Sequence, residues 1–102
     1  MVQTRHYELE RKEREALIQQ IGVGKPVAKF KWDRGHKDGP EIHVITDTAM
    51  IIIYNAITNR HCTTLIARPG QIRRYYEMVG KTAPKYLVDL AYEHQKMGYN
   101  KR

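Results

Sequence analysis

Two histidines stand close together in the sequence, on either side of a short stretch rich in glycine and charge. They are His36 and His43 in "RGHKDGPEIH", and the segments that flank this stretch have the composition of β-strands. Histidine can act as an acid and as a base near neutral pH. Cleavage of RNA without a metal needs a base, an acid and a cation at the phosphate. The pair therefore allows two interpretations: half of such an active site, or ordinary polar residues of a turn and a strand.

A cluster of arginines and tyrosines follows in "LIARPGQIRRYY". Arg68 comes directly after a predicted strand, so its backbone origin is well fixed, and a guanidinium matches the oxygens of a phosphate. The tyrosines could stack on bases. The alternative is a solvated helix face in which at least one of Tyr75 and Tyr76 belongs to the core.

The sequence contains no pattern typical of a metal or cofactor site. The histidines and nearby aspartates could be imagined as ligands, but the usual motif spacings, such as His-Glu-x-x-His or Cys-x-x-Cys, are absent. The single cysteine, Cys62, cannot form an intramolecular disulfide, and it lies in an alternating strand pattern that favours packing over catalysis. We therefore expect no metal and no cofactor.

The elements that must position these side chains follow from hydrophobic periodicity. Residues 5–20 read as a helix with a narrow apolar stripe and with Glu–Lys and Glu–Arg pairs four residues apart. Residues 27–67 read as four strands, "VAKFKWD", "EIHVIT", "AMIIIY" and "HCTTLIA", whose short connections imply antiparallel neighbours. The third is so apolar that it predicts a central strand covered on both faces. In the second, alternation places His43 opposite Ile42 and Val44, on what we expect to be the polar face.

The segment "RPGQIRRYYEMVG" is compatible with two structures. The apolar spacing that begins at Ile72 favours a helix opened by Pro69, whereas alternation would make a fifth strand. A clearer helix follows in "TAPKYLVDLAYEHQKMG", with Thr82 as its cap. The sequence thus predicts a single α+β domain, with an N-terminal helix, a four-stranded antiparallel meander, and C-terminal helices within residues 69–97 packed on one face.

Composition limits the possible functions. A chain of 102 residues has room for one core, and its hydrophobic content of 41% argues against disorder. The net charge is +7, and residues 1–20 are balanced, so the excess lies in the rest of the chain and favours an anionic partner. The N-terminus has no apolar signal region, and no apolar run is long enough for a membrane span. We expect a cytoplasmic protein without a membrane partner.

Two stretches, "RGHKDGPEIHVIT" and "IIIYNAITNRHCTTLIARPGQIRRYY", resemble small proteins of phages and prophages in Gram-positive bacteria. Their pattern is distantly similar to the ribonuclease toxins that include barnase, the colicin nucleases, the EndoU-type nucleases and the RelE-type toxins. Those proteins have a helical N-terminal part followed by an antiparallel sheet whose face cuts RNA. The resemblance covers about residues 27–76. It implies a loop histidine, a strand histidine and a basic strand-end residue at His36, His43 and Arg68, with Thr64 as a polar helper.

We therefore expect a basic protein of phage or prophage origin that acts on nucleic acid in a bacterial host, with RNA favoured over DNA. As a metal-independent ribonuclease it would use His43 as the general base, His36 as the general acid and Arg68 as the phosphate clamp. The residues expected to contact the nucleic acid are Arg73, Arg74, Gln71, Tyr75 and Thr64. Two alternatives remain: a non-catalytic nucleic-acid-binding module, and a protein whose partner is an acidic protein, such as an inhibitor or assembly factor. The oligomeric state stays open.

Overall fold

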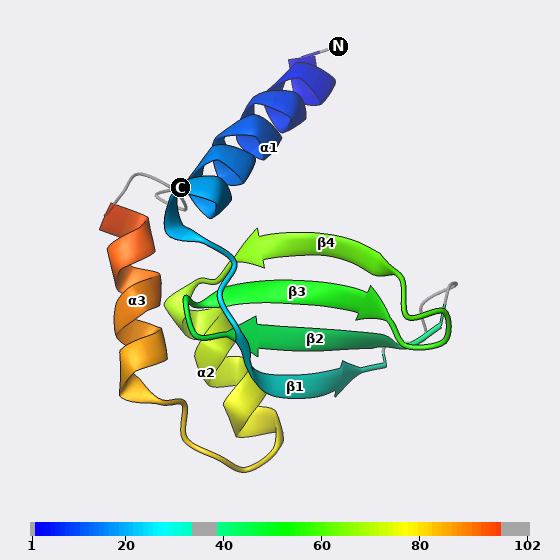
Figure 1. Cartoon of the computed structure of the whole chain (residues 1–102), viewed down its shortest axis with the longest axis vertical. Coiled ribbons are helices and arrows are strands. Elements are labelled where there is room, and N and C mark those ends of the chain that lie inside the picture. Colours follow the sequence, from blue (N-terminus) through cyan, green and yellow to red (C-terminus); the bar gives the residue numbers. More distant parts are fainter. Residues whose placement is uncertain (1, 34–38, 97–102) are drawn as a thin grey trace.

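The computed structural model describes residues 2–33 and 39–96, with side chains from residue 12 onward within these ranges. The elements in chain order are α1 (Val2–Ile21), β1 (Pro26–Trp32), β2 (Glu41–Thr46), β3 (Met50–Asn55), β4 (His61–Ile66), α2 (Pro69–Met78) and α3 (Lys85–Lys96). The four strands form one antiparallel sheet in the order β1–β2–β3–β4 (Figure 1). The predicted α+β fold is confirmed.

The segment that allowed a helix or a fifth strand is helical. Pro69 occupies the first turn of α2, and the side-chain oxygen of Gln71 accepts a hydrogen bond of 2.9 Å from the backbone N–H of Arg68. Ile72 and Tyr75 are both buried. The helical period places these two side chains on one face, whereas a strand would point them to opposite faces. The helix is therefore the structure that buries both.

The core lies between one face of the sheet and the helices α2 and α3. Figure 1 shows α2 behind the strands and α3 beside α2. The buried core residues are Phe30, Ile45, Ala49, Ile51, Ile53, Ala67, Ile72, Tyr75, Leu87, Val88 and Ala91. Each fully buried aliphatic side chain of this kind contributes about 2 kcal/mol to folding, so this layer dominates the stability of the domain.

The predicted central position of β3 is confirmed, but its two faces are buried differently. Ile51 and Ile53 belong to the core beneath the helices. Ile52 points to the opposite face and is only 8% exposed, between Val44 of β2 and Thr64 of β4. Among the described elements, no second layer of helices covers that side of β3. The neighbouring strands shield it instead.

The helix α1 contacts the sheet along β4 and leaves the rest of that second face uncovered (Figure 1). The link from α1 to β1 is held by Thr48, whose hydroxyl lies 2.8 Å from the carbonyl oxygens of Gly22 and Val23. Gly24 has φ +82°, and a β-carbon there would collide with the carboxylate of Asp47. This fixed link sets where α1 leaves the sheet. Among the described residues, no helix is long and apolar enough to cross a membrane.

Candidate functional site

The structure places His43 inside the protein, on the sheet face that α2 covers. The side chain is 6% exposed, and its ring stacks on Trp32 with centroids 5.2 Å apart. Its Nδ1 lies 2.5 Å from the hydroxyl of Tyr75, and its Nε2 lies 3.0 Å from a carboxylate oxygen of Glu41. Because the carboxylate only accepts, Nε2–H donates to Glu41, while Nδ1 shares a hydrogen bond with the hydroxyl of Tyr75. Both ring nitrogens are therefore occupied by protein side chains.

This placement corrects the expectation that the polar face of β2 is exposed. Glu41, His43 and Ile45 do share one face, as alternation predicts, but this is the face beneath α2. Tyr75 comes from α2 and supplies the hydrogen-bond partner that makes burial of the imidazole possible. The polar character of this face therefore reflects a polar cluster in which His43 and Tyr75 are buried and Trp32 and Glu41 are half-buried.

The structure does not bring His43 and Arg68 together. Arg68 is exposed and precedes the first turn of α2, at the end of the sheet where β4 stops. Across the sheet, His43 pairs with Ile53 of β3, and Ile53 pairs with Thr63 of β4. The backbone positions of His43 and Arg68 are thus separated by about 10 Å across the strands and by more than about 10 Å along them. The third expected member of the group, His36, lies outside the described residues.

The residues expected to contact nucleic acid are distributed over different parts of the molecule. Tyr75 is a core residue, and Gln71 serves as a capping residue of α2. Arg73 and Arg74 are exposed on the same helix. Thr64 is half-buried on β4. It pairs with Ile52 of β3 and lies on the sheet face opposite α2 and α3.

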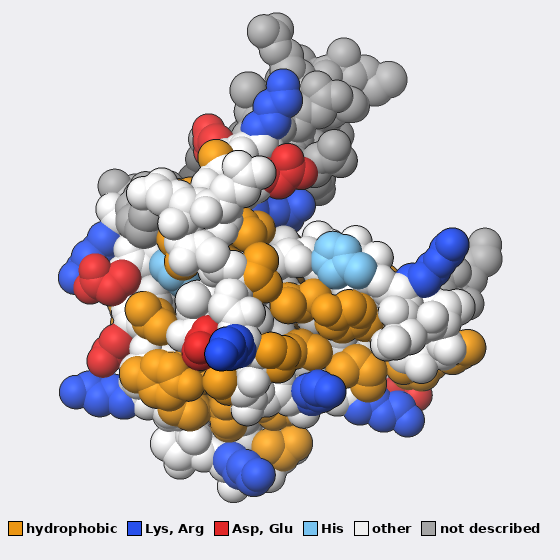
Figure 2. All heavy atoms as spheres, viewed as in Figure 1, with side chains coloured by type: hydrophobic (Ala, Val, Ile, Leu, Met, Phe, Trp, Pro, Cys, Tyr) orange, Lys and Arg blue, Asp and Glu red, His pale blue; other side chains and the backbone are white. Residues whose placement is uncertain are grey.

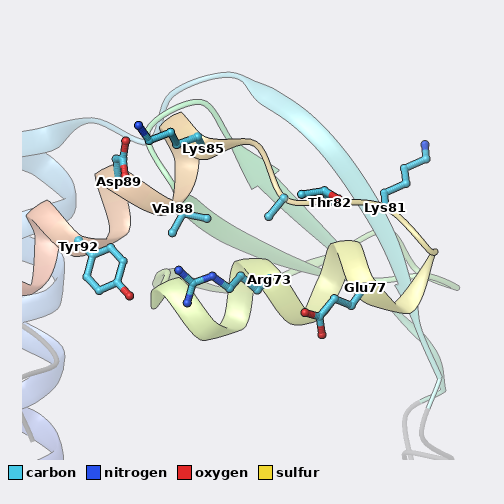
Figure 3. Close-up of a pocket in the computed structure, with 9 residues that line it drawn as sticks. Arg73, Glu77, Lys81, Thr82, Lys85, Val88, Asp89 and Tyr92 are labelled. Atoms are coloured by element: carbon cyan, nitrogen blue, oxygen red, sulfur yellow. The ribbon is translucent and has the colours of Figure 1, made fainter.

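Arg73 lies in a groove between α2 and α3 (Figure 3). Its guanidinium carbon is 5.8 Å from the ring centre of Tyr92, a cation–π contact across the groove. The groove has a volume of about 420 Å³, and its charged lining residues are Arg73, Glu77, Lys81, Lys85 and Asp89. Because two carboxylates accompany the three cations, this groove is only weakly selective for an anion.

The uncovered sheet face contains a different hollow, with a volume of about 670 Å³. It is lined by Pro26, Lys29, Phe30, Lys31, Ile42, Val44, Tyr54 and Asn59. The strand register sets Lys31 beside Ile42 and Ile42 beside Tyr54, so that a cation, an apolar residue and an aromatic ring follow one another across three strands. Among the described residues, no carboxylate lines this hollow. Figure 2, drawn from this side, shows hydrophobic side chains over the sheet with Lys and Arg around them.

His61 stands beside this hollow, at the start of β4. Its ring lies 5.8 Å from that of Tyr54, and its Nε2 is 2.9 Å from the hydroxyl of Thr64. His61 is exposed, in contrast to His43 and to the buried His94. It is thus an accessible imidazole on the uncovered face.

Lys29, Lys31 and Tyr54 were not among the residues that the sequence singled out. The alternation in "VAKFKWD" does place the two lysines on one face of β1. The sequence does not show which face of the sheet the helices leave uncovered.

Within the described ranges, no group of His, Cys, Asp and Glu side chains is arranged to hold a metal ion. Comparison with known proteins gives no match, since no protein-family model, no curated protein and no solved structure is detectably similar to this chain.

Proposed function

We propose that this protein binds single-stranded nucleic acid on the uncovered face of its sheet. The observation that supports this most strongly is the lining of the hollow, where Lys29, Lys31 and Tyr54 surround an apolar floor and none of the described lining residues is a carboxylate. Tyr54 is half-buried. Cations beside an aromatic ring that a base can reach are the combination that single-strand binders use. The net charge of +7 adds long-range attraction for a polyanion.

Each part of the hollow has a role in this proposal. The ring of Tyr54 stacks on a base, and the half-buried Ile42 beside it forms the floor on which the base rests. Lys29 and Lys31 project from the same face of the edge strand β1 and contact successive phosphates. Stacking on an aromatic side chain is worth about 1–3 kcal/mol per base. A duplex keeps its base faces stacked on each other, so a single strand is the better ligand.

Binding of a fluorescein-labelled oligonucleotide of about 12 nucleotides, a length within the range of known single-strand sites, tests the proposal by anisotropy. We expect the Lys29→Ala/Lys31→Ala variant to bind about tenfold or more weakly and with a salt dependence reduced by about two ionic contacts. We expect Tyr54→Ala to weaken binding about 5- to 150-fold through lost stacking. The matched control is Lys81→Ala/Lys85→Ala, which removes the same charge from the α2–α3 groove.

The two double variants distinguish a defined site from general charge attraction. Equal weakening by both, or duplex DNA bound as tightly as the single strand, would contradict the proposal. Absence of any affinity at low salt would favour an acidic protein as the partner instead.

A second candidate function is metal-independent RNA cleavage on the same face. The observation that favours it is His61, an exposed imidazole that contacts Tyr54 and is hydrogen-bonded to Thr64. Incubation with labelled RNA in EDTA should then give 2′,3′-cyclic ends, and His61→Ala should abolish the cleavage. Loss of cleavage in a folded His43→Gln variant, with His61→Ala active, would instead support the assignment of His43 as the base. If the RNA stays intact, binding without cleavage is the function that remains.

A further inference from the structure

A second hollow on the sheet lies between α1 and β4. It has a volume of about 440 Å³ and is lined by Arg14, Glu15, Ile18 and Gln19 of α1 and by His61, Cys62, Thr63 and Thr64 of β4. This volume falls within the range of small-ligand sites, about 300–1,000 Å³, and one nucleobase fits in it. The name α1–β4 groove is used for this hollow below.

The α1–β4 groove adjoins the hollow of the proposed nucleic-acid site. Tyr54 lines that hollow, and its ring is in edge-to-face contact with His61, which lines the groove. His61 is in turn hydrogen-bonded to Thr64. A strand that stacks one base on Tyr54 therefore reaches the groove with its next nucleotide.

The two hollows differ in the chemistry of their linings. Lysine, tyrosine and aliphatic side chains accept any base, because every nucleotide has a phosphate and an aromatic face. The α1–β4 groove instead presents hydrogen-bonding groups, among them the amide of Gln19 and the hydroxyl of Thr64. Hydrogen bonds to base edges are what distinguish one base from another.

We propose that the α1–β4 groove reads the edge of one base and gives the protein a sequence preference, an inference that rests on the proposed binding of single strands. The amide of Gln19 suits adenine, because it can donate to N7 and accept from the exocyclic amino group at the same time. The preferred base is therefore adenine. Arg14, at the same groove, contacts the phosphate of the recognised nucleotide.

The test compares the affinities of the whole protein for oligo(dA), oligo(dC) and oligo(dT) of equal length. We expect oligo(dA) to bind at least about tenfold more tightly than oligo(dC) or oligo(dT), as one well-placed base contact provides. Gln19→Ala should reduce this preference to about threefold or less, through a loss of affinity for oligo(dA). Lys29→Ala/Lys31→Ala should weaken all three oligonucleotides by the same factor.

Equal binding of the three oligonucleotides by the unaltered protein overturns the inference and leaves the proposed function intact. A preference for oligo(dC) or oligo(dT), or a loss in Gln19→Ala that is equal for all three, overturns it as well. If none of the three binds at low salt, the proposed function and the inference fail together.

Discussion

The two faces of β2 are buried to a similar degree, with His43 6% exposed and Val44 4% exposed, but different parts of the molecule shield them. One face carries Glu41, His43 and Ile45 and lies under α2, where His43 is 6% exposed. The other carries Ile42 and Val44 and lines a hollow that no described helix covers. The difference teaches that the helices cover the face whose polar side chains they hydrogen-bond, as Tyr75 of α2 does with His43. The face that they leave uncovered is apolar. An uncovered apolar face bordered by cations is a surface that a bound ligand would cover.

The largest expected difference between the faces is in stability. Ile45→Ala should lower the free energy of unfolding by about 2–5 kcal/mol, because Ile45 is fully buried beneath the helices and leaves a cavity there. Ile42→Ala should cost about 1 kcal/mol, because Ile42 is half-buried at the hollow. Urea unfolding of both variants measures the difference. Equal costs would show that a further layer covers the open face, and the comparison of the two faces would then fail.

The polar cluster of the covered face is tested by Tyr75→Phe. This variant keeps the ring that packs on Phe30 at 5.3 Å and removes only the hydroxyl that serves His43. We expect a loss of about 1–3 kcal/mol in unfolding free energy, because a buried ring nitrogen then lacks its partner. The control is Tyr92→Phe, an exposed tyrosine, with an expected change within about 0.5 kcal/mol. Unchanged stability with a selective loss of nucleic-acid binding would place the ligand at His43 after all.

The helix-covered side contains another buried imidazole, that of His94 on α3. It is 3% exposed, and no described group is hydrogen-bonded to its Nδ1. Burial lowers the pKa of His94 below its ordinary value of 6.5, and the nearby Glu93 offsets part of this effect. The unfolded chain therefore takes up this proton at higher pH than the folded protein does. Stability should be lost as the pH falls below 6.5 and through the lowered pKa, and this group should have no effect above that range.

Urea midpoints at about pH 8 and pH 5, on either side of the ordinary histidine pKa, measure this dependence. The His94→Gln variant cannot take up the proton and should show a smaller drop between the two pH values. The same drop in both proteins would rule out His94 as its source.

The smallest expected effect concerns the arginines of α2. Arg73→Ala/Arg74→Ala should weaken oligonucleotide binding less than about threefold, because charges beyond a Debye length of about 8–10 Å are largely screened. The Lys29→Ala/Lys31→Ala variant, with the same change in charge, serves as the comparison in the same anisotropy assay. A larger loss of affinity from the arginine pair would show that the oligonucleotide binds on the helical side of the sheet. The comparison of the two faces would then be wrong.

Much of the fold could be predicted because its signals are local. The spacing that begins at Ile72 and the proline that opens α2 predict a helix, and the structure has one. The short connections predict antiparallel neighbours, and the meander follows. The boundaries were less accurate, since α1 extends over Val2–Ile21 and the prediction had residues 5–20. Ends of helices depend on few interactions, so they are weakly encoded.

The candidate site was predicted less well, because its members come together only through distant contacts. Alternation separated His43 from Ile42 and Val44, which is correct, but a period of two does not tell which set lies beneath a helix. Arg68 adjoins a strand end as expected, yet the register of two strand pairings, β2 with β3 and β3 with β4, sets its distance from His43. The hollow of Lys29, Lys31 and Tyr54 gave no signal as a group, because its residues come from β1 and β3.

The amino-acid sequence by itself determined the types and order of the elements, the α+β class and the two sets of side chains on each strand, because these follow from backbone periodicity over neighbouring residues. Only the tertiary structure decided that α2 lies over the face of His43. That choice rests on a hydrogen bond between residues 32 positions apart, from Tyr75 to His43, and on the burial of Ile45 and Ile72 in one core. The exposed face, and with it the proposed binding surface, is the consequence of that packing.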